Sequence, residues 1–378
     1  MNLTNTDEQS WLSESIEAIL SRAWVPPQDL ARATPERRHR VWQELVGFGA
    51  LGIGTGIGET DGLRATELCL IARALGRQLA AVPFLGSAAV RLALAPDAGS
   101  LPPALASVLA GRQAIGVALL EPGRGWTTEA AGTRLVRGPD GLRLHGAKVA
   151  VEQLHVAEQL AVVATLDGGP ALAVAPARLA GLVTRAQRCF DDTVMMGSAE
   201  FAGVTVPASS VLGGPGARQA LDRLMTAGAL LAAAEAAGAA DRVFRLACDY
   251  AAQRRQFGRS IGSFQALRHL LADAYVRAES GWSAVRYAAA ALDEGAPEAA
   301  QAVSVAKAYV SRGAREVAHT AMQVFGGIAF TAEHPAHRFL RRIGVRAQQF
   351  GDAAYHERLL GQALADRARQ PHETASVA

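Results

Sequence analysis

Three stretches of the chain differ in how apolar and polar positions alternate. Residues 6–23 place apolar side chains three or four positions apart, a spacing that predicts one buried face of an α-helix. The same period recurs over residues 65–80, and Pro83 is predicted to end that helix. The first block is therefore predicted to be a helical domain over residues 1–113.

From about residue 114 the apolar positions come in short runs instead. Runs such as 115–120, 160–164 and 171–175 are separated by turn-forming residues, among them the segment 167–170. Short strands with such punctuation indicate an antiparallel sheet or a small barrel. This middle β domain is predicted over residues 114–212.

Helical periodicity returns after residue 213, in four long segments. They cover residues 217–254, 263–293, 297–327 and 353–369. Short connections between long helices favour antiparallel neighbours, so residues 213–378 are predicted to form a four-helix bundle. Helices and strands fall in separate blocks, which makes the fold class α+β.

The charge of the chain does not indicate a nucleic-acid partner. Its 378 residues carry a formal net charge of +3, and the calculated pI is near 9.0. No basic run is interleaved with aromatic residues as nucleic-acid binding requires. The pairs Arg37-Arg38 and Arg341-Arg342 are interpreted as solvated helix faces, with contact to phosphate groups as the alternative.

Cysteine usage, the N-terminal residues and the length of the apolar runs predict where in the cell the protein lies. Cys69, Cys189 and Cys248 are far apart and in no metal-ligand spacing, so no metal site and a reducing compartment are predicted. Acidic residues such as Asp7 and Glu8 argue against a signal peptide. No run of about twenty strongly apolar residues is present, so we expect no membrane span and a cytoplasmic protein.

The most informative motif follows the first long helix of the predicted bundle. It reads Tyr-Ala-Ala-Gln-Arg-Arg-Gln-Phe-Gly over residues 250–258 and continues to Gln265. The guanidinium of Arg254 can pair with a pyrophosphate, and the ring of Phe257 can pack on a flat heteroaromatic group. Gly258 permits a sharp turn. The alternative interpretation is a helix C-terminus with a favourable basic charge.

With a second motif the sequence resembles a known family. Residues 321–327 read Ala-Met-Gln-Val-Phe-Gly-Gly, followed by Phe330, Thr331 and Glu333. Both motifs, in this order and at this separation, resemble the signatures of acyl-CoA dehydrogenases, and the resemblance covers nearly the whole chain. It implies an N-terminal helical domain, a middle β domain and a C-terminal four-helix bundle. It also implies an FAD between the β domain and the bundle, usually across a subunit interface.

The resemblance assigns positions to that cofactor. They are Arg254, Gln256, Phe257, Ile261, Gln265, Gln323, Gly326 and Gly327. Gln323 and Gly327 match positions that approach the FAD of a neighbouring subunit. Two further matches are Glu121-Pro122-Gly123, a turn near the flavin, and the segment 145–148, which corresponds to the usual Asn-Gly-x-Lys.

The catalytic position of the family departs from its pattern. Members remove the α-proton of an acyl-CoA with a carboxylate, while the β-hydride passes to the flavin. The usual position of that carboxylate is Phe350 in this chain, and the alternative position on the first bundle helix is Gly228. Neither residue accepts a proton, so no catalytic residue is predicted at the family positions.

Other acids near these positions have structural interpretations. Asp352 is a weak candidate for a displaced base, and its alternative role is the N-cap of the last helix. Glu235 lies two helical turns beyond Gly228, about 10 Å away, and is interpreted as structural. His356 and Glu357 are interpreted as surface or interface groups.

The flavin contacts of the β domain also depart from the family pattern. Leu120 stands where a Thr is common, Ala150 where a Trp is common, and Glu152 where a second Thr is common. The resemblance therefore supports the bundle half of a flavin site more strongly than the β half.

Four functions are compatible with these residues. The first is the base-less subunit of a heteromeric acyl-CoA dehydrogenase, paired with a base-bearing paralogous subunit. The others are a homomeric dehydrogenase with a displaced base, a flavin-dependent oxidase or oxygenase of the same fold, and a nonenzymatic assembly protein. The resemblance implies an acyl-CoA substrate, an electron-transfer flavoprotein as the acceptor of electrons, and a dimer or tetramer.

Overall fold

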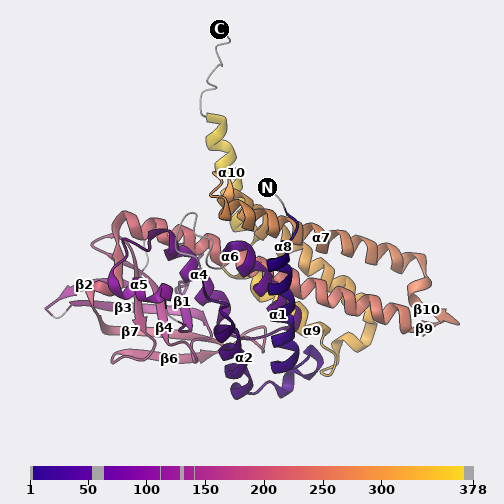
Figure 1. Cartoon of the computed structure of the whole chain (residues 1–378). Helices are drawn as coiled ribbons and strands as arrows, with labels where there is room; N and C mark the ends of the chain where they lie inside the picture. Colours follow the sequence, from indigo (N-terminus) through magenta and orange to yellow (C-terminus); the bar gives the residue numbers. More distant parts are fainter. Residues whose placement is uncertain (1–2, 53–63, 111, 128–131, 140, 370–378) are drawn as a thin grey trace, which may run out of the picture.

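The chain forms a helical block, a sheet and a second helical block in sequence order (Figure 1). The computed structural model describes residues 3–52, 64–110, 112–127, 132–139 and 141–369. The sheet and the tip of the β9–β10 hairpin lie at opposite ends of the molecule, and the N-terminal helices pack between them (Figure 1). This arrangement agrees with the predicted fold class.

Five helices make up the described part of the N-terminal block. They are α1 (Asp7–Ala23), α2 (Pro35–Phe48), α3 (Ala65–Gln78), α4 (Phe84–Leu94) and α5 (Pro103–Ala110), with 3-10 turns η1 (Pro27–Arg32) and η2 (Ala95–Asp97). The side chain of Thr6 accepts a hydrogen bond from the backbone N–H of Gln9 and so caps α1. Much of the glycine-rich segment after α2, residues 53–63, lies outside the described residues.

The N-terminal block is joined to the bundle by a close crossing of α3 over α6 (Gly214–Gln253). A Cβ at Gly76 of α3 would lie 2.0 Å from the carbonyl oxygen of Glu235. A Cβ at Gly238 of α6 would lie 2.1 Å from the carbonyl oxygen of Arg73. Glycine is therefore required at both positions, and this contact fixes Glu235 beneath the C-terminus of α3.

The middle block is one mixed sheet of eight strands. They are β1 (Ile115–Ala118), β2 (Arg134–Gly138), β3 (Gly141–Glu152), β4 (Gln159–Leu166), β5 (Gly169–Pro176), β6 (Leu182–Gln187), β7 (Met196–Val206) and β8 (Val211–Gly213), with the turn η3 (Ala208–Ser210) before β8. The order is β6-β7-β3-β2-β4-β5-β8, and β1 also pairs with β4. The predicted antiparallel pairing holds for most strands, but β4 pairs in parallel with both β1 and β2. The expectation of a purely antiparallel domain is therefore corrected.

Burial on both faces of strand β4 explains why its sequence is a continuous apolar run. Residues 160–164 are all fully buried, because each face of the strand meets a different core. Ala161 and Val163 belong to the core shared with the helices, whereas Leu160 and Val162 belong to the interior of the β domain. The sheet thus packs on the helices through alternate residues.

Up to residue 369, where the described part ends, the C-terminal block contains five helices, one more than the four that were predicted. They are α6, α7 (Gln265–Asp293), α8 (Ala299–Phe325), α9 (Ala336–Gln348) and α10 (Ala353–Arg369), with strands β9 (Arg255–Gln256) and β10 (Arg259–Ser260) and turns η4 (Ile261–Ser263) and η5 (Gly326–Phe330). Helix α9 packs against both α6 and α8. It was not predicted because four arginines interrupt its apolar positions, which include Phe339 and Ile343.

Candidate functional site

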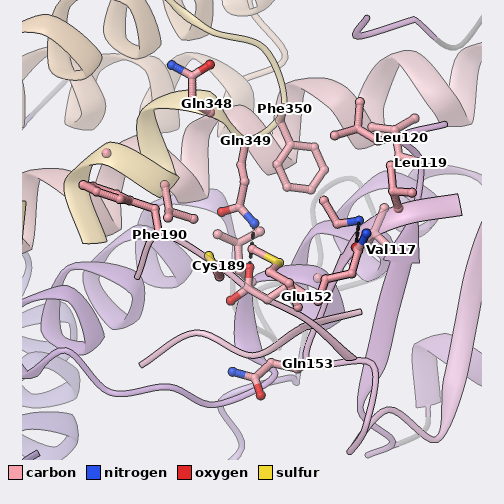
Figure 2. Close-up of a pocket in the computed structure, with 18 of the residues that line it drawn as sticks. Val117, Leu119, Leu120, Glu152, Gln153, Cys189, Phe190, Gln348, Gln349 and Phe350 are labelled. Carbon is pink, nitrogen blue, oxygen red and sulfur yellow. Dashed lines mark hydrogen bonds between the residues drawn. The ribbon is translucent and has the colours of Figure 1, made fainter. Parts of the chain in front are cut away.

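A pocket of about 780 Å³ opens where the sheet meets the C-terminal helices. Its walls come from the start of α4, strands β1 and β3, the segment after β6, helices α8 and α9, and the turn before α10. Figure 2 shows Phe350 facing Leu119 and Leu120, with Glu152 and Gln349 joined by a hydrogen bond. The pocket is therefore assembled from all three blocks of the chain.

Phe350 and Gly228, which the sequence resemblance assigns to the two base positions, lie against each other beside this wall. A Cβ added to Gly228 would lie 2.3 to 2.5 Å from three carbons of the Phe350 ring. The Phe350 ring is buried, and the ring of Trp126 stacks beside it with centroids 6.2 Å apart. This part of the pocket is apolar, and the phenyl ring occupies the space that a side chain at position 228 would need.

The backbone of Phe350 is held by a buried histidine. Phe350 and Gly351 have φ angles of 55° and 96°, so both lie in the left-handed region. The Nε2–H of His356 donates to the carbonyl oxygen of Phe350 at 3.0 Å, and Nδ1 of the same ring accepts from Ser304 at 3.1 Å. Burial lowers the pKa of His356 to about 4, although the bond to Phe350 opposes the shift. The interpretation of His356 as a surface group was wrong.

Asp352 caps the last helix. Its carboxylate accepts a hydrogen bond from the backbone N–H of Tyr355 at 2.8 Å. It does not belong to the described residues that line the pocket. Glu357 is exposed and pairs with Arg312 at 2.7 Å. Neither carboxylate reaches the pocket, and the role of Asp352 as a helix cap accounts for its position.

Glu152 is the only carboxylate among the described residues of the pocket wall. Both of its oxygens pair with the guanidinium of Arg346, at 2.7 and 2.8 Å, and the amide of Gln349 donates to it at 2.8 Å. Burial raises the pKa of Glu152, but the charge and hydrogen bonds of Arg346 outweigh this effect and lower it overall. An ionised carboxylate bound in this way is a poor base.

Behind the pocket wall a second arginine of α9 connects the three blocks. Arg342 is fully buried and pairs with Asp191 at 2.6 Å and with Glu235 at 2.8 Å. The interpretation of Arg341-Arg342 as a solvated face was therefore wrong for Arg342. Glu235 also pairs with Arg346 at 2.9 Å, which agrees with its structural interpretation.

A fully buried lysine lies beneath the same wall. The ammonium group of Lys307 donates to the backbone carbonyl of Arg346. Burial and the nearby positive charge of Arg346 lower the pKa of Lys307 to about 7. Together Lys307 and His356 hold backbone carbonyls before and within the turn that carries Phe350. No feature of the sequence alone indicated this role.

Two matches to the family pattern form one buried ion pair. The ammonium group of Lys148 lies 2.8 Å from Glu121 and also donates to the carbonyl oxygen of Leu119. Burial raises the pKa of Glu121, but hydrogen bonds from Lys148 and from the backbone of Thr133 and Gly132 outweigh burial and lower this pKa to about 2. This pair ties the segment after β1 to β3 and so positions Leu120 on the pocket wall.

The pocket wall formed by β3 offers few free groups to a flavin. Leu120 is apolar, and Ala150 carries no ring. The backbone N–H of Ala150 is bound by the side chain of Gln187 at 2.8 Å, and Glu152 is bound by Arg346. The polar edge of an isoalloxazine needs hydrogen-bond partners, and both the backbone N–H of Ala150 and the carboxylate of Glu152 are already engaged. The residues present do not fit that group well.

The residues predicted to hold FAD lie elsewhere, at the far end of the bundle. Arg254, Gln256, Phe257, Gln265, Gln323, Gly326 and Gly327 are exposed, and Ile261 is half-buried. The ring of Phe257 is 91% exposed and meets Phe264 edge-on. The ring of Tyr250, at the end of α6, packs on Phe325 with centroids 5.3 Å apart, which brings the two motifs together. None of the eight lines the described pocket.

Four of the six non-glycine residues with a positive φ angle among the described residues lie in these two regions, and the other two are Leu79 and Asp167. Ala150, Gln153 and Phe350 have φ angles between 52° and 55° and line the pocket, and Phe257 has a φ of 51° at the bundle end. Non-glycine residues in this region cost about 1 to 3 kcal/mol each and concentrate at functional sites. Within the described part of the chain no group of residues resembles a metal site.

Comparisons with known proteins agree with this geometry. The family described as "Acyl-CoA dehydrogenase, C-terminal domain" matches residues 214–365. The acyl-CoA dehydrogenase FadE27 of Mycobacterium tuberculosis is 29% identical, over 97% of this chain and 99% of that protein. The ChsE4-ChsE5 complex of the same organism contains a chain with 27% identity and a TM-score of 0.82, covering 97% of this chain and 99% of that one.

A second similar structure is a variant of the Tcur3481-Tcur3483 steroid ACAD. It is 29% identical with a TM-score of 0.84, covering 96% of this chain and 99% of that one. Residues 214–365 thus match the C-terminal domain of acyl-CoA dehydrogenases, and nearly the whole chain is similar in sequence and fold to proteins of that name. No described helix is both long enough and apolar enough to cross a membrane.

Proposed function

We propose that this chain is the subunit without a catalytic base in a heteromeric, FAD-dependent acyl-CoA dehydrogenase. Its role is to complete the flavin site of a base-bearing partner. The observation that carries the proposal is the contact between Phe350 and Gly228. The two positions that hold the base in the family share one space, and a phenyl ring fills it.

The remaining acids support the same function. Proton abstraction needs a carboxylate with a free oxygen near the substrate. Glu152 has both oxygens bound by Arg346 and a lowered pKa, and Asp352 caps a helix away from the pocket. A homomeric dehydrogenase with a displaced base therefore has no candidate within the described pocket wall.

The distribution of flavin contacts supports a partner. On the β wall the backbone N–H of Ala150 and the carboxylate of Glu152 are engaged within the chain, whereas the bundle end presents Arg254, Gln323 and Phe257 to solvent. When bound, FAD supplies the acceptor for the hydride of the acyl group. On this chain the guanidinium of Arg254 would pair with the pyrophosphate, and the amide of Gln323 would bond a polar edge of the cofactor.

The similar structures suggest the partner and the substrate class. One of them is named as a complex of ChsE4 with ChsE5, and the other is called a steroid ACAD. We extend both to this chain, which gives a paralogous base-bearing partner and a lipid- or steroid-derived acyl-CoA. The electron acceptor is then an electron-transfer flavoprotein, as the family resemblance implies.

The test is the visible spectrum of the purified chain, alone and co-expressed with a base-bearing paralogue from the same genome. An acyl-CoA panel is then added to each sample. We expect a yellow complex whose flavin is bleached by a substrate, and no bleaching by the chain alone. Bleaching of flavin by the chain alone would show that it is a complete enzyme and would refute the proposal.

A matched pair of variants tests the contribution of the bundle end. Arg254→Ala in the complex should lower the flavin content, because a pyrophosphate contact is lost. Arg255→Ala is the control, since Arg255 is the exposed neighbour of Arg254 and is not among the positions that the resemblance assigns to the cofactor. Equal flavin content in both variants would argue against this part of the proposal.

A further inference from the structure

Lysine is rare in this chain, and both of its lysines are buried. Lys148 and Lys307 are the only lysines in 378 residues, and arginine and histidine supply all other basic side chains. The two lysine side chains are 0% and 1% exposed. A buried amine can release its proton, whereas a guanidinium keeps its charge in a protein. A buried lysine in a chain that otherwise uses arginine is therefore a candidate for a group that titrates.

The two lysines differ in what surrounds the amine. Nζ of Lys148 lies 2.8 Å from the carboxylate of Glu121, so its charge is balanced. Nζ of Lys307 donates to the backbone carbonyl of Arg346. Among the residues that the structure describes, it has no second acceptor and no carboxylate within ion-pair distance. An ammonium group has three donors, so this site suits the neutral amine better than the charged form.

The charges around Lys307 act in the same direction. Burial lowers its pKa most, Arg346 of α9 lowers it further, and Asp352 before α10 opposes the shift, which leaves a value of about 7. The positive charge of Lys307 in turn lowers the pKa of His356 on α10. Other charges on the elements packed against α8 have partners of their own: Glu235 of α6 pairs with Arg346, Arg277 of α7 with Glu316, and Glu357 of α10 with Arg312.

The amine of Lys307 bonds the segment that places Phe350 on the pocket wall. Arg346 lies in the last turn of α9, and Phe350 and Gly351 follow it with φ angles of 55° and 96°. A Cβ at Gly351 would lie 2.4 Å from the ring of Tyr355, so the turn closes tightly on α10. A non-glycine residue in the left-handed region persists where its surroundings hold it. The bond from Lys307 to the end of α9 is one of these restraints.

We propose that Lys307 makes this turn sensitive to pH and so sets the shape of the pocket wall at Phe350. Above neutral pH the neutral amine donates to the carbonyl of Arg346, and the turn keeps the described conformation. Below neutral pH the ammonium group needs acceptors that the site lacks, so the end of α9 moves to admit water or Asp352. Gln349 and Phe350 move with it, because they follow directly. This inference goes beyond the proposed function and holds with or without a partner subunit.

The small number of lysines allows a direct measurement. NMR of the full chain labelled with ε-¹³C lysine should show two lysine signals, and Lys307→Met assigns them. We expect the Lys307 signal to titrate with a pKa of about 7, below the ordinary value of 10.5. A Lys307 signal that titrates at the ordinary value would overturn the proposal, because the amine would then stay charged across the neutral range.

A second signal reports the position of the turn. The ring of Trp126 stacks beside that of Phe350 with centroids 6.2 Å apart. The ¹⁹F signal of Trp126 in a chain labelled with fluorotryptophan therefore depends on the Phe350 ring, and Trp126→Phe assigns this signal. We expect it to shift with the same midpoint as the Lys307 signal. A Trp126 signal that stays constant through that titration would overturn the link between Lys307 and the pocket wall.

Two variants assign the transition to Lys307. Lys307→Met removes the amine but keeps an unbranched side chain, so the Trp126 signal should remain at its high-pH position. His356→Gln is the matched control, because it removes the other titratable group that bonds the turn, and the transition should persist. A transition that survives in Lys307→Met or disappears in His356→Gln would overturn the proposal. If Lys307→Met does not fold, the lysine titration and His356→Gln still decide.

The two proposals fail in different ways. Flavin bleaching by the chain alone would refute the proposed function and leave the titration of Lys307 unchanged. A Lys307 signal with the ordinary lysine pKa would refute the pH-sensitive turn, and the proposed function would stand.

Discussion

The pocket and the far end of the bundle differ in how their polar groups are satisfied. On the inner wall of the pocket Glu152, Arg346 and Gln349 bind one another. At the bundle end Arg254 and Gln323 are exposed to solvent. Groups that pair within the chain stabilise its own fold, whereas exposed groups beside an exposed aromatic ring suit an external ligand or subunit. The comparison teaches that the proposed function divides the molecule: its own pocket wall pairs polar groups within the chain, whereas the bundle end leaves them available to a neighbour.

The largest expected effect comes from removing the buried ion pairs of Arg342 behind the pocket wall. Arg342→Ala leaves Asp191 and Glu235 as buried charges with one partner fewer, so we expect a loss of about 3 to 5 kcal/mol in the free energy of unfolding. Arg341→Ala is the control, since its pair with Asp192 is exposed, and we expect a loss under about 1 kcal/mol. Urea unfolding measures both, and similar values for the two variants would contradict the structural role of Arg342.

The next effect is a pH dependence that arises at the pocket turn. The pKa of His356 is lowered to about 4 in the folded chain from an ordinary value of 6.5. The unfolded chain therefore binds more protons between these values, and stability rises with pH in this window. The stabilisation is present above pH 6.5 and lost as the pH falls to about 4, by about 3 kcal/mol in total.

A variant assigns this dependence to the histidine. His356→Gln keeps a donor for the carbonyl of Phe350 but does not titrate, so the slope of stability against pH should flatten between pH 4 and 6.5. Urea unfolding at several pH values measures the slope. A variant with an unchanged slope would show that other groups cause the loss.

A smaller loss of stability is expected from crowding the contact between Gly228 and Phe350. Gly228→Ala places a methyl group within 2.5 Å of the phenyl ring, so we expect a loss of about 1 to 3 kcal/mol from overpacking. Gly361→Ala in α10 meets nothing within 4 Å and should be neutral or stabilising by up to about 1 kcal/mol. Thermal unfolding compares the two, and adding Phe350→Leu to Gly228→Ala should recover most of the loss.

The smallest expected effect on stability concerns Phe257 at the exposed far end of the bundle. Phe257 is 91% exposed with a φ of 51°, a conformation that asparagine adopts more readily than phenylalanine. Phe257→Asn should therefore change the free energy of unfolding by less than about 0.5 kcal/mol. The flavin content of the complex should nevertheless fall. A large loss of stability in the isolated chain would show that this ring serves the fold.

The sequence predicted the order of the blocks because periodicity depends on local burial. The helix 336–348 was missed because Arg342 and Arg346 interrupt its apolar face, and no local rule shows that a distant Glu152 or Asp191 will neutralise them. For the same reason His356 was assigned to the surface. The parallel pairs of β4 were missed because strand direction depends on the whole topology.

The candidate site was predicted in part. Phe350 and Gly228 were identified from their places in the motifs, but their contact required the folded chain. Trp126 could have been found as an aromatic residue just after the turn 121–123, whereas the positions of Arg188 and Arg315 on the pocket wall carry no sequence signal. The eight predicted FAD residues remain a prediction, and the structure gathers them at the bundle end.

The contact between Phe350 and Gly228 also constrains how this lineage can change. A mutation that restores an acidic residue at position 228 is blocked while the phenyl ring remains, since even a Cβ does not fit. A smaller residue at position 350 must be acquired first, and that change leaves a cavity beside Trp126 that costs about 3 to 5 kcal/mol for alanine. The two substitutions are epistatic, so recovery of an acid at position 228 has to pass through a destabilised intermediate.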